Sequence, residues 1–237
     1  MSVDEITPVA QDYLKVIWSA TEWGGPAIGT KELALRFGTT AANVSETVKR
    51  LATQHLVEHQ PYKPVVLTER GTDLALAMVR RHRLVESFLV ETLGYDWDEV
   101  HDEAERLEHA VSDTMIDRID RLLGHPVADP HGDPIPAADG TVTRPAGTVN
   151  LSETGAGAFT VVRISDADPA CLGRLLALEV LPGATIMVIL DDSTRGRKAH
   201  SPLGTHLADA DIDSVWVSPG VGRATGRSFP APRHPTR

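Results

Sequence analysis

Residues 101–109 read His-Asp-Glu-Ala-Glu-Arg-Leu-Glu-His, and this stretch constrains the fold more than any other part of the chain. An α-helix turns by about 100° per residue, so His101, Glu105, Glu108 and His109 would share one sector of its surface roughly 100° wide. That sector carries two imidazoles and two carboxylates, and both kinds of group bind divalent metals. The other interpretation is a plain solvated face of an acidic helix.

A second pair of metal-binding side chains precedes this stretch. His82 and Glu86 are four positions apart, so a helix would carry both on one face. Because carboxylate and imidazole occur together without a thiolate, the two groups suit a borderline-hard cation rather than a soft one. The segment before them has the order of helices and strands of a DNA-binding module, as described below. This context favours metal binding over a plain solvated face.

The composition is that of an ordinary globular protein with more than one domain. The chain has 237 residues, of which 41% are hydrophobic and 24% are charged. Its formal net charge of −10 argues against indiscriminate binding to nucleic acid. Residues 25–73 nevertheless hold six basic and five acidic residues, so this segment is close to neutral within an acidic protein. Such a module can approach phosphate when its cations cluster or when divalent cations assist.

Nothing in the sequence indicates secretion or membrane insertion. The first residues include Asp4 and Glu5 and lack the apolar stretch of a signal peptide, and the most apolar window, 172–190, is broken by charges and a Pro-Gly turn. The single cysteine, Cys171, excludes an internal disulfide and fits a reducing compartment. We therefore expect a cytoplasmic protein that does not bind membranes.

The first third of the chain predicts a winged helix. An amphipathic helix over 8–20 is followed by a short helix over 31–37 and, after a glycine, by another over 41–54. Two helices joined by a tight glycine-containing turn form a helix-turn-helix. Two β-rich runs around 61–64 would form a hairpin directly after the recognition helix. A hairpin at this place is the wing of a winged helix. The alternative is a small helical core with an incidental hairpin.

Residues 68–123 are expected to be almost entirely helical. One helix would run from Thr68 to about Thr92, and a second would span 97–110. A third helix, starting at Ser112, carries a continuous apolar stripe. The members of this stripe are Met115, Ile116, Ile119, Leu122 and Leu123. Such a stripe is more often core, but little sheet is available to cover it, so we expect an interface between two copies of the chain.

After a turn-rich connection over 125–140, glycine and β-branched residues become more frequent. Strands are predicted over 158–164, 185–190 and 215–218, with a short helical turn over 169–178. This spacing fits a small antiparallel β-barrel.

We therefore expect a mainly α protein with a small β part, arranged in four segments. A winged helix DNA-binding domain (5–73) is followed by a helical dimerisation and metal-binding domain with a proline-rich linker (74–140). A β-barrel domain (141–220) and a disordered basic tail (221–237) complete the chain. The tail holds four arginines and no acidic residue.

No catalytic motif is present in the sequence. The metalloprotease pattern His-Glu-x-x-His, the di-iron pattern Glu-x-x-His, a glycine-rich phosphate loop and a nucleophile elbow are all absent, and Cys171 has no evident partner. We expect neither enzymatic activity nor a small-molecule substrate. A helical metalloenzyme with an accessory winged domain is the alternative from a different functional class.

The combination of these features resembles a known family. A winged helix followed by Arg81-His-Arg-Leu-Val-Glu86 and by Val100-His-Asp-Glu-Ala-Glu-Arg-Leu-Glu-His-Ala-Val-Ser-Asp113 is similar to the diphtheria-toxin-repressor family of metal-dependent repressors. The run from Pro130 to Pro136 and the Leu-Pro-Gly turn at 181–183 are similar to that family's linker and its SH3-like C-terminal β-barrel. The resemblance covers about residues 5–220.

The resemblance implies about two metal sites per subunit. The first site would take one ligand from the N-terminal helix and three from the motif helix, and these are Asp12, Glu105, Glu108 and His109. The ligands of the second site would be His82, Glu86, His101 and, from the C-terminal domain, Asp168.

The resemblance also indicates which metal binds. In the iron-sensing branch of the family the position of Glu105 is a cysteine and that of Asp12 a methionine, whereas this chain has carboxylates at both. Mn²⁺ stands lowest in the general affinity order, so hard ligands and geometry are the means by which a protein can favour it. We expect Mn²⁺ as the co-repressor, with Fe²⁺ as the alternative. Lys15 stands where some manganese sensors have an acid, so we expect two separated sites rather than one close binuclear site.

The expected function is manganese-dependent repression of metal-uptake genes by a homodimer bound to a palindromic operator. A metal that joins the helix of Asp12 to the dimer-forming helices would fix how both recognition helices face the DNA. The residues that match the family's DNA-facing positions near the start of the recognition helix are Thr40, Ala42, Asn43, Ser45 and Glu46. Lys49 and Arg50 are the candidates for phosphate contacts.

Overall fold

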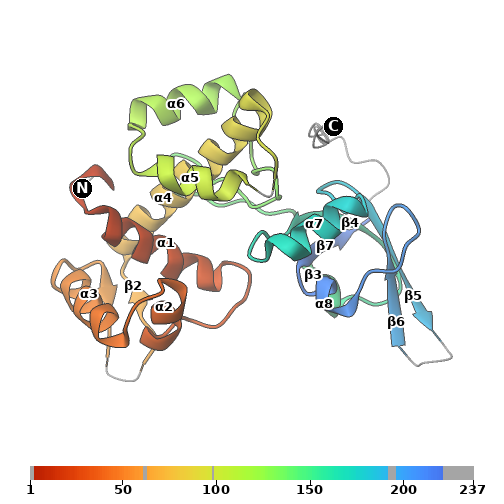
Figure 1. Ribbon diagram of the computed structural model, residues 1–237, viewed down its shortest axis with the longest axis horizontal. Coiled ribbons are helices and arrows are strands. Elements are labelled where there is room, and N and C mark those ends of the chain that lie inside the picture. Colours follow the sequence, from red (N-terminus) through yellow and green to blue (C-terminus); the bar gives the residue numbers. More distant parts are fainter. Residues whose placement is uncertain (1–2, 61–62, 98, 192–195, 221–237) are drawn as a thin grey trace. The chain divides into compact units, whose positions relative to one another are not determined.

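The computed structural model shows helices in the first half of the chain and a small sheet in the second (Figure 1). The residues that it describes are 3–60, 63–97, 99–191 and 196–220. The expectation of a disordered tail over 221–237 lies outside the described residues.

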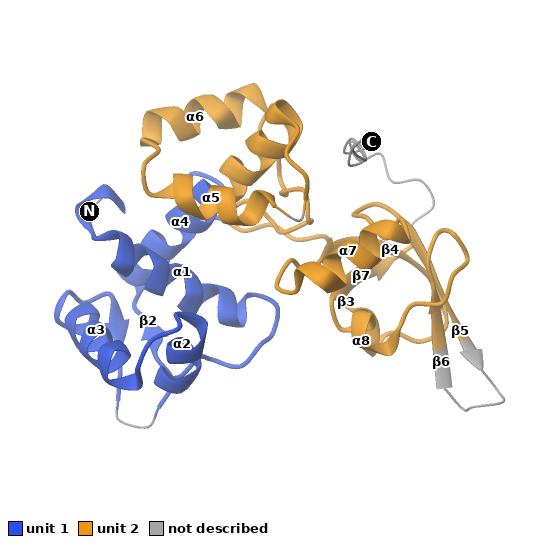
Figure 2. Ribbon diagram, in the orientation of Figure 1, with its two compact units in different colours: residues 1–82, 136–141 blue, residues 83–135, 142–237 orange. Residues whose placement is uncertain are grey.

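The chain forms two compact units (Figure 2). Unit 1 comprises residues 1–82 and 136–141, and unit 2 comprises residues 83–135 and 142–237. The four domain boundaries expected from the sequence stay a prediction. Among the described residues, no helix combines the length and apolarity needed to cross a bilayer.

Unit 1 contains the winged helix. Its elements are η1 (Val3–Glu5), α1 (Pro8–Glu22), α2 (Thr30–Arg36), α3 (Ala41–Thr53), β1 (Val57–Glu58), β2 (Val66–Leu67) and most of α4 (Glu69–Phe88). Strands β1 and β2 pair antiparallel, with Val57 opposite Leu67. The predicted order of a helix, a helix-turn-helix and a hairpin is confirmed.

The local sequence sets the position of the recognition helix α3. At its start the Thr40 hydroxyl accepts a hydrogen bond from the Asn43 N–H at 3.2 Å, which satisfies one of the unpaired amides of the first turn. Val44, Val48 and Leu51 turn inward at helical spacing, and none of them is exposed. The opposite side of α3 is thereby left facing solvent.

Unit 2 contains the remaining elements. They are the π-helical turn η2 (Leu89–Leu93), α5 (Val100–Glu108), α6 (Asp113–Leu122), β3 (Val149–Asn150), η3 (Leu151–Glu153), β4 (Gly157–Ile164), α7 (Pro169–Ala177), β5 (Thr185–Asp191), β6 (Gly196–His200), α8 (Asp209–Ile212) and β7 (Val215–Pro219). α4 continues into η2, and Gly94 ends this run with a left-handed φ of 75°. One unbroken helix therefore carries His82 and Glu86, although the division between the units falls just after His82.

The apolar stripe of α6 is mostly covered by its own chain. Ile116, Ile119 and Leu123 are buried in the core of unit 2, together with side chains of η2 and α5. Only Met115 and Leu122 are exposed, at 44% and 65%. The expectation that all five residues face a second copy is wrong for these three buried side chains, because α6 packs onto the neighbouring helices of the same unit.

The C-terminal part of unit 2 is a five-stranded antiparallel sheet of order β3-β7-β4-β5-β6. Val161, Ile164 and Val217 of the sheet and Leu172 and Leu175 of α7 belong to one buried cluster. The three strands and the helix predicted here are confirmed as β4, β5, β7 and α7. The sequence did not predict β3 or β6, and closure into an SH3-like barrel stays a prediction.

Gly71, in the first turn of α4, provides a test of the packing in unit 1. A Cβ at this position would lie 1.9 Å from the carbonyl oxygen of Leu56, which itself accepts a hydrogen bond from the Thr68 N–H. We expect Gly71→Ala to lower the free energy of unfolding by about 1–3 kcal/mol, since the backbone must shift to admit the methyl group.

Gly173, in the interior of α7, is the matched control because a Cβ there would meet nothing within 4 Å. Gly173→Ala should leave stability unchanged or raise it by up to about 1 kcal/mol through helix propensity. Urea unfolding followed by circular dichroism measures both variants. Equal stability of Gly71→Ala and the wild type would contradict the close approach of α4 to Leu56.

Candidate metal centres

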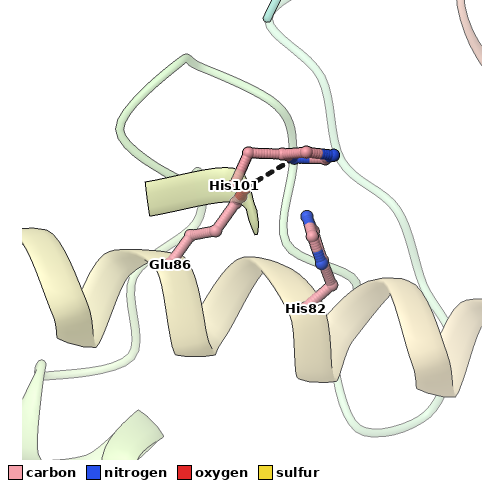
Figure 3. A group of neighbouring side chains, drawn as sticks. All are labelled: His82, Glu86 and His101. Carbon is pink, nitrogen blue, oxygen red and sulfur yellow. Dashed lines mark hydrogen bonds and ion pairs between the residues drawn. The ribbon is translucent and has the colours of Figure 1, made fainter. Parts of the chain in front are cut away.

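Three predicted ligands gather between α4 and α5 (Figure 3). His82 and Glu86 come from successive turns of α4, and His101 comes from the first turn of α5. Their ligand atoms all lie within 4.8 Å of one another, and His101 Nδ1 is 3.1 Å from Glu86 Oε1. Glu86 is almost fully buried at 1% exposure, so this carboxylate needs a positive partner inside the protein.

A second group of possible ligands shares Glu86 and lies entirely in unit 2. It consists of Glu86, His131 of the linker and Asp166, which follows β4 by two residues, with one ligand atom of each within 4.8 Å of the others. Asp166 Oδ2 is also 3.3 Å from His101 Nδ1. We call the set Glu86, His101, His131 and Asp166 the Glu86 centre.

The geometry of His131 fits a metal ligand. The side chain is 1% exposed, and its buried Nε2 has no hydrogen-bond partner among the described residues. An imidazole nitrogen buried without a partner is costly unless a cation or a water binds it. Imidazole and carboxylate together form the donor set that suits Mn²⁺, Fe²⁺ or Zn²⁺. The residues present therefore fit a divalent cation.

The acidic surroundings hold a proton on His101. Hydrogen bonds to Asp166, Glu105 and Glu86, in that order of importance, raise the pKa of His101 to about 12. Burial alone would raise the pKa of Asp166, but its hydrogen bond to His101 and the nearby imidazoles of His131 and His101 together outweigh burial and lower this pKa well below the usual range. Without a metal, the His101 imidazolium thus supplies the positive charge that these carboxylates require.

Sequence reasoning missed two residues of the Glu86 centre and chose a neighbour of one of them. Asp168, the predicted ligand, is the N-cap of α7, and its side chain accepts a hydrogen bond from the Ala170 N–H at 2.9 Å. Asp166, two positions earlier, is the acid that reaches His101. His131 stands within the proline-rich run that resembles the family's linker, and that run was the available signal for it.

The ligands predicted for the first site are distributed over both units. Asp12 is half-buried on α1 of unit 1. Glu108 and His109 stand at the end of α5 in unit 2, where Glu108 is completely buried and its Oε1 lies 3.6 Å from His109 Nε2. Glu105 is more exposed and approaches His101 instead, with 3.6 Å between Oε1 and Nε2.

The DNA-binding candidates lie along α3. Thr40, Ala42, Asn43 and Glu46 are exposed and Ser45 is half-buried. The side chains of Asn43 and Ser45 already donate hydrogen bonds, at 3.1 Å to Thr39 Oγ1 and at 2.8 Å to the Ala41 carbonyl. Lys49 and Arg50 are exposed one to two turns farther along α3. This face therefore offers small polar groups at its start and cations after them.

Family models cover the helical part of the chain. The model described as the iron-dependent repressor N-terminal DNA-binding domain matches residues 5–65, and that of the iron-dependent repressor metal-binding and dimerisation domain matches residues 68–137. The iron-dependent repressor IdeR of Mycobacterium tuberculosis is 31% identical over 225 residues, which cover 93% of this chain and 89% of the relative. The chain belongs to the diphtheria-toxin-repressor family of metal-dependent transcriptional repressors. The resemblance inferred from the sequence is confirmed.

Solved structures of this family extend the similarity through the C-terminal sheet. A structure of a manganese-dependent transcriptional repressor in complex with manganese is 47% identical, covers 88% of this chain and 98% of its own, and has a TM-score of 0.80. The manganese regulator SloR is 30% identical with a TM-score of 0.73, covering 91% of this chain and all of its own.

A further sequence relative matches a shorter part of the chain. The diphtheria toxin repressor of Corynebacterium diphtheriae is 33% identical over 135 residues, covering 57% of this chain and 59% of that protein.

The proton on His101 predicts how metal binding depends on pH. An imidazole must lose its proton to become a ligand, so a cation that uses His101 releases a proton below pH 12. The apparent affinity for Mn²⁺ should therefore rise with pH between about 6.5 and 8.5, by up to about tenfold per unit. The same raised pKa stabilises the metal-free fold, fully below about pH 6.5 and progressively less as the pH rises toward that of the folded imidazole.

Titrations of Mn²⁺ at several pH values, with free Mn²⁺ measured by electron paramagnetic resonance, follow this dependence. His101→Gln removes the competing proton and should flatten the dependence on pH. A wild-type affinity that does not change over this range would show that Mn²⁺ does not displace a proton from His101.

Proposed function

We propose that this protein is a manganese-dependent repressor of metal-uptake genes, with Mn²⁺ as its co-repressor. The observation that carries this choice is the chemistry of the ligands. Asp12 and Glu105 are carboxylates, and the Glu86 centre holds only carboxylates and imidazoles. The single cysteine, Cys171, is buried in α7 with its Sγ 3.3 Å from Asp211, so it belongs to neither set.

The proposed stoichiometry is about two cations per subunit. One would bind Asp12, Glu105, Glu108 and His109, and the other would bind the Glu86 centre with His82 beside it. A divalent cation supplies charge neutralisation and directional bonds to these donors. Because Asp12 stands on the helix of the DNA-binding unit, its participation would tie that unit to the helical part of the chain and restrict how the recognition helix is presented.

The acting form is proposed to be a homodimer in the cytoplasm, bound to a palindromic operator. A family domain for dimerisation covers residues 68–137, and exposed Met115, Leu122 and Leu93 offer apolar surface in that region. Two recognition helices related by a twofold axis read two half-sites of a palindrome. An iron-dependent repressor is the alternative within the family. Three of the relatives named above are described as repressors and the fourth as a manganese regulator, which disfavours the metalloenzyme alternative.

Loss of either proposed ligand at the end of α5 should abolish activation by metal. We expect Mn²⁺ to raise the affinity for DNA at least about tenfold in the wild type, corresponding to typical coupling energies of 1–3 kcal/mol. Glu108→Ala and His109→Ala should bind DNA as the metal-free wild type does, because they lack ligands of the first site. Fluorescence anisotropy on a duplex selected from a random-sequence library with the Mn²⁺-loaded protein measures this.

His125→Ala is the matched control for these variants. His125 is an exposed histidine after α6 that pairs with Asp120 at 2.7 Å, away from both ligand sets. It should keep the full response to Mn²⁺. A metal response of wild-type size in Glu108→Ala or His109→Ala would mean that the first site is assigned to the wrong residues.

The preference for one metal over another should depend on Asp12 and Glu105, the two positions at which this chain has carboxylates and the iron-sensing branch of the family has sulfur ligands. Sulfur ligands favour later and softer metals, so Asp12→Met combined with Glu105→Cys should shift activation of DNA binding from Mn²⁺ toward Fe²⁺ and Co²⁺. Anaerobic titrations of each metal on the same duplex compare the variant with the wild type. An unchanged order of metals would remove the main support for manganese over iron.

A further inference from the structure

Three of the four ligand-bearing segments of the Glu86 centre, those of Glu86, His131 and Asp166, meet at one buried carboxylate, that of Asp133. Arg163 Nε donates a hydrogen bond to Asp133 Oδ1 at 2.6 Å, and Arg83 Nη2 lies 3.5 Å from the same oxygen. Asp133, Arg83 and Arg163 are 5%, 7% and 8% exposed. We call these three residues the Asp133 cluster.

Each member of this cluster stands two or three positions from a ligand in the sequence. Arg83 precedes Glu86 by three residues on α4, and Arg163 precedes Asp166 by three residues at the end of β4. Asp133 follows His131 by two residues in the linker. A single carboxylate and two arginines therefore join α4, the linker and β4 within three residues of Glu86, His131 and Asp166, whereas the fourth ligand, His101, comes from α5.

The linker is fastened to both neighbours by further contacts. Arg83 Nη1 donates to the Pro134 carbonyl at 2.7 Å, which holds the linker to α4. The Ile164 N–H donates to the His131 carbonyl at 2.9 Å, which pairs the linker with the end of β4. Gly132, with φ of 93°, sits where a Cβ would lie 2.0 Å from the Val162 carbonyl oxygen. The backbones thus approach so closely that only glycine fits.

Arg163 is itself held on its other side. Its guanidinium carbon lies 4.4 Å from the centre of the Trp216 ring on β7, a cation–π contact. The pairing of β4 with β7 is irregular between Val161 and Arg163, as in a β-bulge. Bulges re-aim side chains, and here the irregularity accompanies the turn of Arg163 toward the linker.

We propose that the Asp133 cluster positions the Glu86 centre, so that Arg83 and Arg163 set the affinity for metal without being ligands. This inference rests on the proposed metal-binding function of that centre. Arginines suit the role because their planar fork fixes direction as well as charge. A metal at this centre must bring four segments together, and the cluster holds three of them in register before the metal arrives, which removes an ordering cost from binding.

Arg163→Gln and Asp133→Asn test the proposal in the full-length protein. Both are made in a Glu108→Ala background, which disables the first site and leaves the Glu86 centre as the remaining one. We expect the dissociation constant for Mn²⁺ to rise ten- to a hundredfold, the range typical for residues that orient ligands. Arg163→Lys keeps the charge but not the planar contacts, so its dissociation constant should rise by a smaller factor, and this variant addresses the same question if Arg163→Gln does not fold.

Arg174→Gln is the matched control. Arg174 forms an arginine–aspartate pair with Asp211 at 2.6 Å in the same C-terminal part, and neither residue belongs to a ligand set or to the Asp133 cluster. It should bind Mn²⁺ as the parent does, even if its melting temperature in chelator falls. A purely structural role for Arg163 would instead lower the melting temperature of Arg163→Gln and leave its affinity for Mn²⁺ unchanged.

His131→Ala separates failure of this inference from failure of the proposed function. Loss of the site in His131→Ala with parent affinity in Arg163→Gln, Arg163→Lys and Asp133→Asn would overturn the positioning role alone. Parent affinity in both His131→Ala and His101→Gln would show that the Glu86 centre does not bind Mn²⁺, so the proposed second site and the positioning role would both be wrong.

Discussion

Carboxylates buried away from water require positive partners, and this requirement organises unit 2. Glu86, Glu108, Asp129 and Asp133 are all at most 5% exposed, and an uncompensated charge at such a depth is expensive. These carboxylates differ in the groups that compensate their charge. Two arginines meet Asp133, while Asp129 accepts the N–H groups of His131 and Asp133 at 2.9 Å, and burial still raises the pKa of Asp129. Glu86 faces the protonated His101, the one partner that a metal can replace.

This difference explains how a binding site can coexist with a stable metal-free fold. The arginines of the Asp133 cluster keep their charge at any physiological pH, so the linker stays fastened whether or not a metal binds. His101 can give up its proton, so a divalent cation bound at the Glu86 centre would take the place of a single positive charge. For a chain with a formal charge of −10, each such exchange also reduces the repulsion among its acidic groups.

The helices could be predicted well from the sequence because their signals are local. The caps at Thr40 and Ser112 and the apolar spacing of α3 and α6 each act within a few residues. The short strands β3 and β6 could not, since pairing partners far away in the sequence make them strands. Which surface covers the apolar stripe of α6 is also not set by the local sequence. Ile116 and Ile119 are buried in one cluster with side chains of α5 and η2, and not against a second copy of the chain.

The candidate site was predictable only where one helix carries the ligands. Spacing alone placed His82 with Glu86 and Glu108 with His109, whereas Asp166 meets Glu86 through the docking of the linker on β4. Asp166 and Asp168 are indistinguishable as residue types, and the difference lies in the Pro169 that follows, since Asp168 is needed to cap α7.

The sharing of Glu86 limits how the two ligand groups around it can be occupied. Glu86 belongs to the group with His82 and His101 and to the group with His131 and Asp166, and Asp166 also reaches His101. A cation bound to either group would withdraw negative charge from Glu86 and so weaken the attraction of the other group for a second cation. Two independent cation sites around this one carboxylate are therefore electrostatically unfavourable. Within the proposed function, the Glu86 centre would therefore hold a single cation, and the arginines that fix α4, the linker and β4 around it would act on that one site.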